Sequence, residues 1–211
     1  MNKLFLILLF LSTPAWADLH VLFMGDSLSE GYGVTREHSF PSVIEKKLDE
    51  GAVPFKVKVT NGSVSGSTSA NAPSRLKWFL KSKPDILVLA LGANDGLRGI
   101  DVKSSSDNLA KTIATAKENN IRVVLTGMLI PPNYGADYRD KFSKMYLTLK
   151  NKYQLDFIPF LLEGVAGDKN LNQADGIHPN DKGHRVMADN VLKVLKPIMI
   201  EEFKQRQKAK R

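Results

Sequence analysis

Residues 85–91 read DILVLAL, an almost unbroken aliphatic run that ends directly before the polar segment GAND at residues 92–95. An apolar run of this length without alternation predicts a strand that is buried on both faces, as in a parallel sheet. Helical patterns precede and follow it, at residues 71–81 and 104–119. A buried strand between two amphipathic helices predicts an α/β fold with helices on both faces of the sheet.

The same alternation of strands and helices extends over the rest of the chain. Further strands are predicted at residues 19–24, 55–60, 121–126 and 156–158. Further helices are predicted at residues 38–50, at residues 138–153 and in the segment after Pro179. The chain contains no internal repeat and no interior linker. We therefore expect a single three-layer α/β/α domain whose strands run parallel.

Composition places the protein in a broad class. Its 211 residues are 43% hydrophobic and 25% charged, which is ordinary for a soluble globular domain. The chain has no cysteine. This absence excludes disulfides, thiolate metal sites and a cysteine nucleophile.

The amino terminus differs from the remainder. Lys3 precedes the apolar run LFLILLFL at residues 4–11, and the small-residue pattern Ala-Trp-Ala follows at 15–17. This combination predicts a secretory signal peptide over residues 1–17, with residues 18–211 as the mature domain and an exported location, periplasmic or secreted. The alternative is a core strand or a short anchor helix. Eight apolar residues are too few to cross a bilayer, so no stable membrane anchor is expected.

The chain is basic, with a formal net charge of +8. Basic residues gather at its end, at Lys204, Arg206, Lys208, Lys210 and Arg211. Such a segment can be weakly attracted to anionic lipid surfaces, but a solvated helix end that suits the helix dipole explains it equally simply and is favoured. No basic motif with interleaved aromatic residues appears, so no nucleic-acid partner is expected.

Small and polar residues follow the first three predicted strands. They form GDSLS at residues 25–29, GSVSGS at 62–67 and GANDG at 92–96. Since the carboxyl ends of parallel strands share one edge of a sheet, these loops should converge there. A fourth polar segment, DGIHP at residues 175–179, lies far away in the sequence.

These segments contain the residue types that acyl transfer requires. A serine hydroxyl needs a base to accept its proton, and the base needs a third group to orient it. Ser27 is the candidate nucleophile, His178 the candidate base, and Asp175 can reach the far nitrogen of the imidazole. Taken singly, each residue has a plainer interpretation: Ser27 as a helix cap, Asp175 as a turn former and His178 as a surface residue.

The reaction also needs donors for an oxyanion, held in place before the reaction begins. The candidates are the backbone amides of Ser27 and Gly66 and the side-chain NH₂ of Asn94. Residues 94–96 (NDG) can equally form an ordinary turn. Asp95 is expected to order its loop.

The strings GDSLSEGYG, NGSVSGSTS, GANDGLRG, PPNYG and DGIHPN resemble the SGNH (GDSL) hydrolases, in particular their thioesterase I/lysophospholipase/arylesterase branch. The resemblance implies a flavodoxin-like α/β/α sandwich with about five parallel strands. It also implies that Ser27, Asp175 and His178 form a catalytic triad and that Gly66 and Asn94 support the oxyanion. The chain matches the family at all five positions.

The remaining histidines do not suggest a second site. His20 lies in the first predicted strand, and His38 and His184 lack an acid at a comparable local spacing. No cluster has the spacing of a metal site, and neither dinucleotide-binding nor phosphate-binding loops occur, so no metal and no cofactor are expected.

We therefore predict a hydrolase of small acyl esters or thioesters that works through an acyl-serine intermediate. Leu97, Met128, Leu129 and Ile130 are candidates to line an acyl site, or they simply pack beneath the loops. The alternative from another class is an exported, non-catalytic module that binds a ligand or an envelope surface. Labelling by a fluorophosphonate separates the two, because only an activated serine reacts. Esterase, thioesterase, lysophospholipase and carbohydrate deacetylase activities share this machinery, so the sequence leaves the substrate open.

Overall fold

The computed structural model describes residues 18–209. The predicted signal peptide at residues 1–17 lies outside the described residues, as do Lys210 and Arg211 of the basic carboxyl terminus. Within the described part, no helix is long and apolar enough to cross a membrane.

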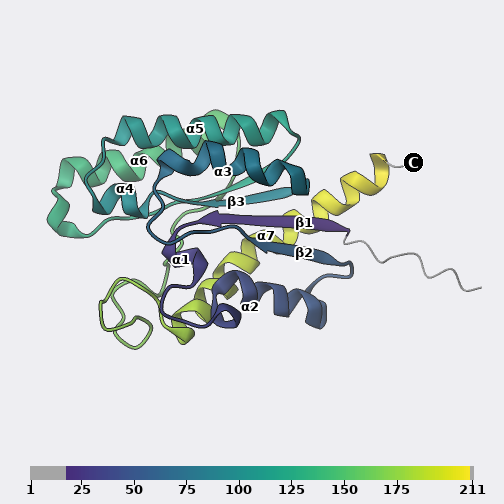
Figure 1. Ribbon diagram of the computed structural model, residues 1–211, viewed down its shortest axis with the longest axis horizontal. Coiled ribbons are helices and arrows are strands. Elements are labelled where there is room, and N and C mark those ends of the chain that lie inside the picture. Colours follow the sequence, from purple (N-terminus) through teal and green to yellow (C-terminus); the bar gives the residue numbers. More distant parts are fainter. Residues whose placement is uncertain (1–17, 210–211) are drawn as a thin grey trace, which may run out of the picture.

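A single sheet of parallel strands forms the middle layer (Figure 1). Its five strands are β1 (Leu19–Gly25), β2 (Val57–Asn61), β3 (Ile86–Ala90), β4 (Arg122–Thr126) and β5 (Asp156–Ile158). They lie in the order β2-β1-β3-β4-β5, and every pair is parallel. The predicted α/β fold with about five parallel strands is confirmed.

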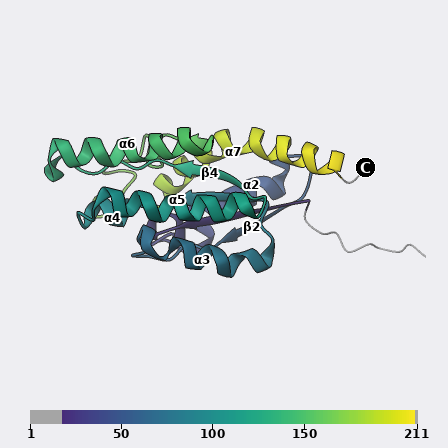
Figure 2. The same cartoon turned by 90° about the horizontal axis from the view of Figure 1, so that it is seen from above.

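Helices cover both faces of the sheet. On one face α3 (Ala72–Phe79), α5 (Val102–Glu118) and α6 (Ala136–Tyr153) lie side by side (Figures 1 and 2). On the other face α2 (Phe40–Lys47) packs against α7 (Asp181–Ala209). Short helical turns occupy Arg36–His38, Leu48–Ala52, Ser69–Asn71, Leu80–Ser82 and Pro132–Tyr134.

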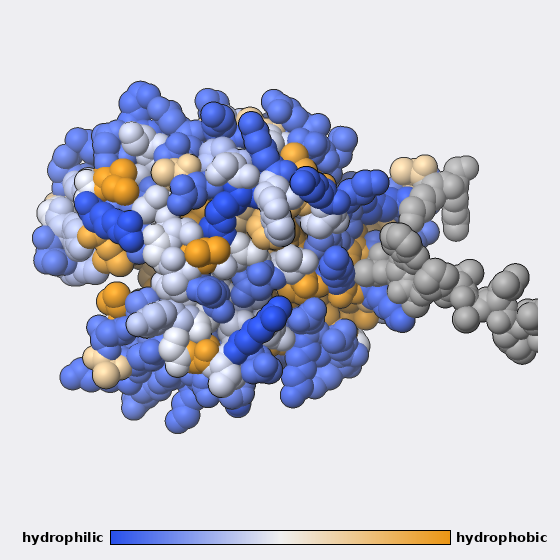
Figure 3. Space-filling model, in the orientation of Figure 1, coloured by the Kyte–Doolittle hydropathy of each residue, from blue (hydrophilic) through white to orange (hydrophobic). Residues whose placement is uncertain are grey.

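Burial follows the position of each strand in the sheet. Every residue of β1 and β3, which lie between other strands, is buried, whereas all of β2 is at least partly exposed. An edge strand has one side open to solvent, which explains the exposed Lys58 in β2. On the face shown in Figure 3 the surface is largely hydrophilic, with several small groups of hydrophobic residues and a larger one towards the right of the view.

Several boundaries differ from the prediction. The strand predicted at residues 55–60 begins only at Val57, because Phe55 instead stacks on Phe203 of α7 with ring centroids 4.3 Å apart. The helix predicted at residues 38–50 begins at Phe40 and leaves regular α geometry after Lys47.

Two short helices, for which the sequence analysis predicted no range, follow the central strands. They are α1 (Ser27–Glu30) after β1 and α4 (Ala93–Leu97) after β3. Residues 94–96, for which a turn was considered, lie inside α4. Helices of four or five residues contain too few apolar positions to produce a periodic signal.

Candidate active site

The three polar loops meet at the carboxyl edge of the sheet, as the sequence predicts. Gly25 at the end of β1 lies opposite Ala90 at the end of β3. The loop after β2 is tied to β1, because the Ser63 hydroxyl accepts the Gly25 N–H at 3.0 Å and the Val64 N–H donates to the Gly25 carbonyl at 3.2 Å. The segment that precedes α7 brings His178 to the same edge.

Ser27, His178 and Asp175 form a continuous hydrogen-bonded relay. The Nε2 atom of His178 lies 3.0 Å from the Ser27 Oγ, and its Nδ1 lies 2.7 Å from the Asp175 Oδ2. The other carboxylate oxygen of Asp175 accepts the backbone N–H groups of Ile177 and His178, both at 3.0 Å. Asp175 therefore fixes both the turn that carries His178 and the orientation of its ring.

The ionisation of Asp175 matches this arrangement. Partial burial raises the pKa of Asp175, but the hydrogen bonds from His178 and Ile177 outweigh it and hold the pKa below its ordinary value. Asp175 is thus a carboxylate at neutral pH. It can accept a hydrogen bond from the Nδ1–H group, and this leaves Nε2 as the acceptor that faces Ser27.

The turn that presents Ser27 is built by its neighbours. Gly25 admits no larger residue, since a Cβ there would lie 2.4 Å from the Ser29 Oγ and 2.9 Å from the Ala90 carbonyl. Asp26 caps α1 by accepting the Leu28 N–H at 3.0 Å. These contacts hold Ser27 as the first residue of a helix, so the positive end of the helix lies at its side chain.

Asp26 is fully buried directly beneath this turn. Burial raises the pKa of Asp26 to about 6, although the Leu28 N–H and the positive charge of protonated His178 act in the opposite direction. Its Oδ2 has no hydrogen-bond partner among the residues that the structure describes.

Two of the three candidate oxyanion residues, Ser27 and Asn94, line the same cavity. Gly66 adopts a φ of +75°, which allows the loop after β2 to turn here. The Asn94 side chain donates one hydrogen to the Ser67 carbonyl at 3.0 Å. Because a side-chain amide carries two hydrogens, Asn94 retains a second one for a ligand. The role of each donor remains a prediction.

Asp95 was expected to order its own loop, but its carboxylate instead binds Ser69 in the segment after β2 and Ser105 in α5. Asp95 is 1% exposed, and its Oδ2 accepts the Ser69 N–H at 2.9 Å. Its Oδ1 accepts the hydroxyls of Ser69 at 2.5 Å and Ser105 at 3.0 Å. In addition, Arg98 donates to the Gly66 carbonyl at 3.1 Å. Residues of α4 thus hold the segment 66–69 in place.

An apolar cavity of about 510 Å³ opens beside Ser27 and His178. All four residues that the sequence suggested for an acyl site line it: Leu97, Met128, Leu129 and Ile130. Phe160 and Leu162, which follow β5, also line it. Sequence analysis missed this pair, although the rule that sites lie beyond the carboxyl ends of strands also applies to β5.

A second residue that the sequence analysis missed is Tyr32. Its ring centroid lies 4.7 Å from that of His178, with the two planes at 43°. It belongs to the string GDSLSEGYG, but no chemical argument pointed to it before the fold was known.

The other histidines have structural contacts. The ring of His20 lies 3.0 Å from the Ser82 carbonyl and 2.8 Å from the Thr60 hydroxyl, and His38 pairs with Asp181 at 2.9 Å. His184 is fully buried, and burial lowers its pKa to about 4. Over residues 18–209, no group of three His, Asp or Glu side chains is arranged to hold a metal ion.

Comparison with known proteins gives consistent matches over most of the chain. Residues 23–186 match the GDSL-like Lipase/Acylhydrolase family. The chain is 37% identical over 193 residues to the esterase TesA of Pseudomonas aeruginosa, covering 90% of this chain and 94% of that protein. It is 39% identical over 186 residues to an arylesterase of Vibrio mimicus, with 88% and 92% covered.

Two further proteins extend the comparison. The thioesterase 1/protease 1/lysophospholipase L1 of Escherichia coli K12 is 34% identical over 196 residues, which cover 92% of each protein. The structure also resembles that of the psychrotrophic esterase EstA from a Pseudoalteromonas species, inhibited by monoethylphosphonate. The TM-score is 0.81 at 31% identity, with 85% of this chain and 98% of that chain covered.

Proposed function

Because the chain belongs to the GDSL-like lipase/acylhydrolase family and is a carboxylic ester hydrolase of the SGNH type, we propose that it works through an acyl-serine intermediate on Ser27. The observation that carries this proposal is the relay from Asp175 through His178 to the Ser27 hydroxyl, with distances of 2.7 and 3.0 Å. A purely ligand-binding module would have no need of an imidazole oriented in this way.

The reaction follows from the relay. His178 Nε2 takes the Ser27 proton as Oγ attacks the carbonyl carbon, and Asp175 stabilises the resulting imidazolium. The imidazolium then gives its proton to the departing oxygen or sulfur, and the bond from the carbonyl carbon to that atom breaks. A water molecule, deprotonated by the same nitrogen, then attacks the acyl carbon, and the imidazolium returns that proton to the Ser27 Oγ as the bond to Ser27 breaks and the acid departs.

The developing oxyanion needs fixed donors. We assign this role to the backbone N–H groups of Ser27 and Gly66 and to the second side-chain hydrogen of Asn94. Ser27 supports the assignment by its place at the start of α1, and Asn94 by the contact that binds it to Ser67. These donors need no rearrangement when charge develops on the substrate.

The apolar cavity is the proposed acyl site. Its volume of about 510 Å³ falls within the range of small-molecule sites, and it opens directly beside Ser27. Leu97, Met128, Leu129 and Ile130 would contact the acyl chain. The substrate is thus a small acyl ester or thioester.

We also propose that the protein is exported. We infer cleavage after Ala17 from the small-residue pattern at residues 15–17, and an exported enzyme would act on substrates outside the cytosol. Weak attraction of the carboxyl terminus to anionic lipid has less support, since Arg206 is paired with Asp85 and Glu202. The solvated helix end remains the favoured interpretation.

Labelling with a fluorophosphonate, combined with mass spectrometry, tests the proposal. The wild-type protein should be modified at Ser27, and Ser27→Ala should remain unlabelled and lose on the order of 10⁴ to 10⁶ in kcat. Ser143→Ala, at a partly exposed serine of α6, is the matched control and should behave as the wild type. Retention of more than about a tenth of the activity by Ser27→Ala would refute the assignment. So would complete loss of activity in EDTA that a divalent cation restores, because the nucleophile would then be a metal-activated water.

A further inference from the structure

Two hollows open at the carboxyl edge of the sheet, and Ser27 lines one of them. The proposed acyl cavity is lined by residues that follow β3, β4 and β5. A second hollow of about 420 Å³ is lined by residues from the segments 30–36 and 61–65, which follow β1 and β2. Since β2 and β3 flank β1 from opposite sides, the loops that line the two hollows come from opposite sides of β1, the strand that precedes Ser27.

An ester bound at Ser27 extends in two directions from its carbonyl carbon, with the acyl chain on one side and the leaving group on the other. Its carbonyl carbon lies at the Ser27 hydroxyl, so an acyl chain in the first cavity directs the leaving group towards the second hollow. The leaving atom must also lie beside His178, which supplies its proton. The side chain that borders both His178 and the second hollow is Tyr32.

Tyr32 is exposed but firmly held. Its side chain is among the most exposed large hydrophobic groups of the described residues, at 53%. Its backbone is fixed, because its N–H donates to the Ser27 carbonyl at 3.1 Å and its carbonyl accepts the Gln173 side chain at 2.7 Å. It follows Gly31, whose φ of +94° turns the chain back towards the site. An exposed ring on a fixed backbone is a ready surface for stacking.

We propose that Tyr32 is a specificity-determining residue that contacts the leaving group and favours esters of planar aromatic alcohols. This inference rests on the proposed acyl-serine function. The aromatic ring of the alcohol would lie against the exposed face of Tyr32. Its polar substituents would reach the hydrophilic wall of the hollow, which includes Arg36, Asn61 and Ser63. A non-planar alkyl alcohol occupies the same space without the aromatic contact.

Two butanoate esters provide the test, one of phenol and one of hexafluoroisopropanol. Both alcohols are acidic, so departure of the leaving group makes similar demands on His178. Tyr32→Leu should lower kcat/KM for the phenyl ester about 2- to 12-fold, the range expected for loss of an aromatic pair. The fluoroalkyl ester should change less than about 2-fold, within the lower bound of that range. Tyr32→Phe should preserve both values, because the ring makes the contact.

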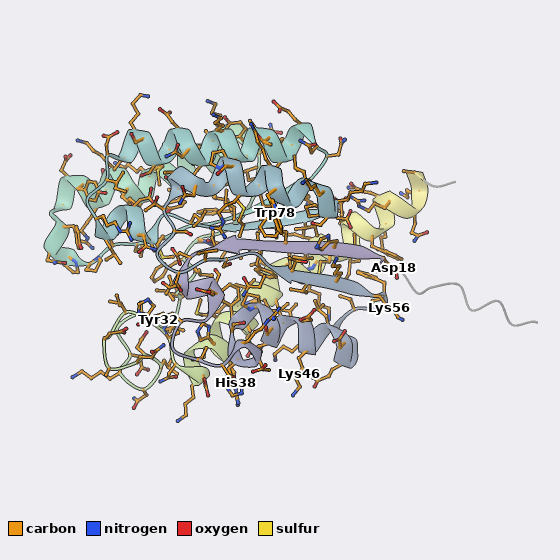
Figure 4. All side chains as sticks on the ribbon, viewed as in Figure 1. Asp18, Tyr32, His38, Lys46, Lys56 and Trp78 are labelled. Atoms are coloured by element: carbon orange, nitrogen blue, oxygen red, sulfur yellow. The ribbon has the colours of Figure 1, made fainter. Side chains whose placement is uncertain are left out.

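Trp78→Leu is the matched control. Trp78 is an exposed aromatic residue on α3, 66% exposed and well away from Tyr32 in Figure 4, and it borders neither hollow. Its loss should leave both rates unchanged. An equal decrease for both esters in Tyr32→Leu would overturn the inference and make Tyr32 only a support for His178.

Fluorophosphonate labelling separates this inference from the proposed function. The leaving group of the fluorophosphonate is fluoride, which is too small to contact Tyr32. Tyr32→Leu should therefore be labelled at the wild-type rate. An unlabelled wild-type Ser27 would refute the proposed function itself. Normal labelling without discrimination between the esters would refute only the role of Tyr32. If Tyr32→Leu does not fold, inhibition of the wild-type enzyme by free alcohols provides the test. Phenol should inhibit at a lower concentration than cyclohexanol. Equal inhibition by the two alcohols would overturn the inference.

Discussion

Asp26 supports the proposed site and, at the same time, destabilises the fold. One carboxylate oxygen caps the helix that carries Ser27, while the other is buried without a partner among the described residues. Burial raises the pKa of Asp26 to about 6. At neutral pH the protein must therefore hold a desolvated charge beneath its proposed nucleophile, which costs free energy of folding.

Asp26 should make the free energy of unfolding depend on pH. The folded pKa of Asp26 lies above that of the unfolded chain, so the folded state binds the proton more tightly. Its contribution to stability therefore falls as pH rises from about 4 to 6. Asp26→Asn keeps an oxygen for the Leu28 N–H without the charge. It should raise the free energy of unfolding by about 2–3 kcal/mol at pH 8 and leave it unchanged near pH 4.

Urea unfolding at both pH values measures this effect. Asp140→Asn, at an exposed carboxylate that pairs with Lys144, should change stability by less than about 0.5 kcal/mol at either pH. Equal stability of Asp26→Asn and wild type at pH 8 would show that Asp26 is not charged in a desolvated site.

His184 acts in the opposite sense within the same pH range. Its Nδ1 accepts the Phe40 N–H at 3.3 Å, and burial lowers its pKa to about 4. The folded state resists protonation here, so stability is present above the unfolded pKa of about 6.5 and is lost as pH falls towards 4. Asp26 and His184 thus partly cancel, and Asp26→Asn should unmask the acid sensitivity that His184 confers.

At the scale of elements, α4 connects the loop after β2 to the site. Two of its side chains and that of Arg98, the residue after its end, bind that loop: Asn94 contacts Ser67, Asp95 contacts Ser69 and Arg98 contacts Gly66. Two proposed oxyanion donors, Gly66 and Asn94, are thereby linked by hydrogen bonds. Their relative position depends on the carboxylate of Asp95, which receives three hydrogen bonds.

Replacing Asp95 by Asn should loosen this unit. Asparagine has one acceptor oxygen, so its NH₂ would face a donor of Ser69 or Ser105. We expect a loss of about 1–3 kcal/mol in stability from the unmet hydrogen bonds. We also expect a decrease of kcat by up to about 10²-fold with KM nearly unchanged, since the displaced groups act on the transition state.

The control for this variant is Asp107→Asn, at an exposed residue of α5 that pairs only with Lys103. It should match the wild type in steady-state kinetics and in urea unfolding. If Asp95→Asn lost stability but kept its kcat, the loop would hold its geometry without Asp95, and the element would not position the donors.

Strong local signals made most elements predictable. The apolar runs at residues 19–24, 85–91 and 121–126 became central strands because only a covered parallel sheet can bury such segments on both faces. Boundaries were less predictable where a tertiary contact decides them, as at Phe55. The residue ranges of α1 and α4 could not be predicted, because helices of four or five residues have too few apolar positions to give a periodic signal.

Some residues of the candidate site could be predicted from the sequence, and others could not. Ser27 and Asn94 could be selected because each follows a predicted strand, so its place at the sheet edge follows from topology, whereas His178 was selected for its imidazole and its spacing from Asp175. Tyr32 could not, since its position beside His178 depends on the turn at Gly31 and on the contact with Gln173. Phe160 and Leu162 likewise reach the acyl cavity only through the conformation of the loop after β5.

At the scale of the whole molecule, α7 joins the two ends of the sheet. It begins three residues after His178 and extends over 29 residues to the opposite, amino-terminal edge of the strands (Figure 1). There Arg206 pairs with Asp85, which precedes β3, at 2.6 Å. Asp85 also accepts the His20 N–H at 2.7 Å, so this carboxylate joins α7 to β1.

Removal of Arg206 tests how far this cluster stabilises the fold. Its partners are nearly buried, with side-chain exposures of 15% for Asp85 and 12% for Glu202. Arg206→Ala would leave these two carboxylates without their shared cation, a larger loss than that of a surface pair. Because Arg206 is itself 35% exposed, solvent screening reduces the expected cost to about 1–2 kcal/mol.

Lys103→Ala is the comparison, since its pair with Asp107 is 82% and 64% exposed and should contribute less than about 0.5 kcal/mol. Urea unfolding at pH 7 in low and high salt measures both variants. The effect of Arg206→Ala should persist in salt, because partly buried pairs are screened less than exposed ones. Its kcat/KM should equal that of the wild type, since Arg206 and Ser27 lie at opposite edges of the sheet. Equal losses in the two variants would show that burial of the partners adds nothing, and a decrease in kcat/KM would show that α7 transmits strain from one edge of the sheet to His178 at the other.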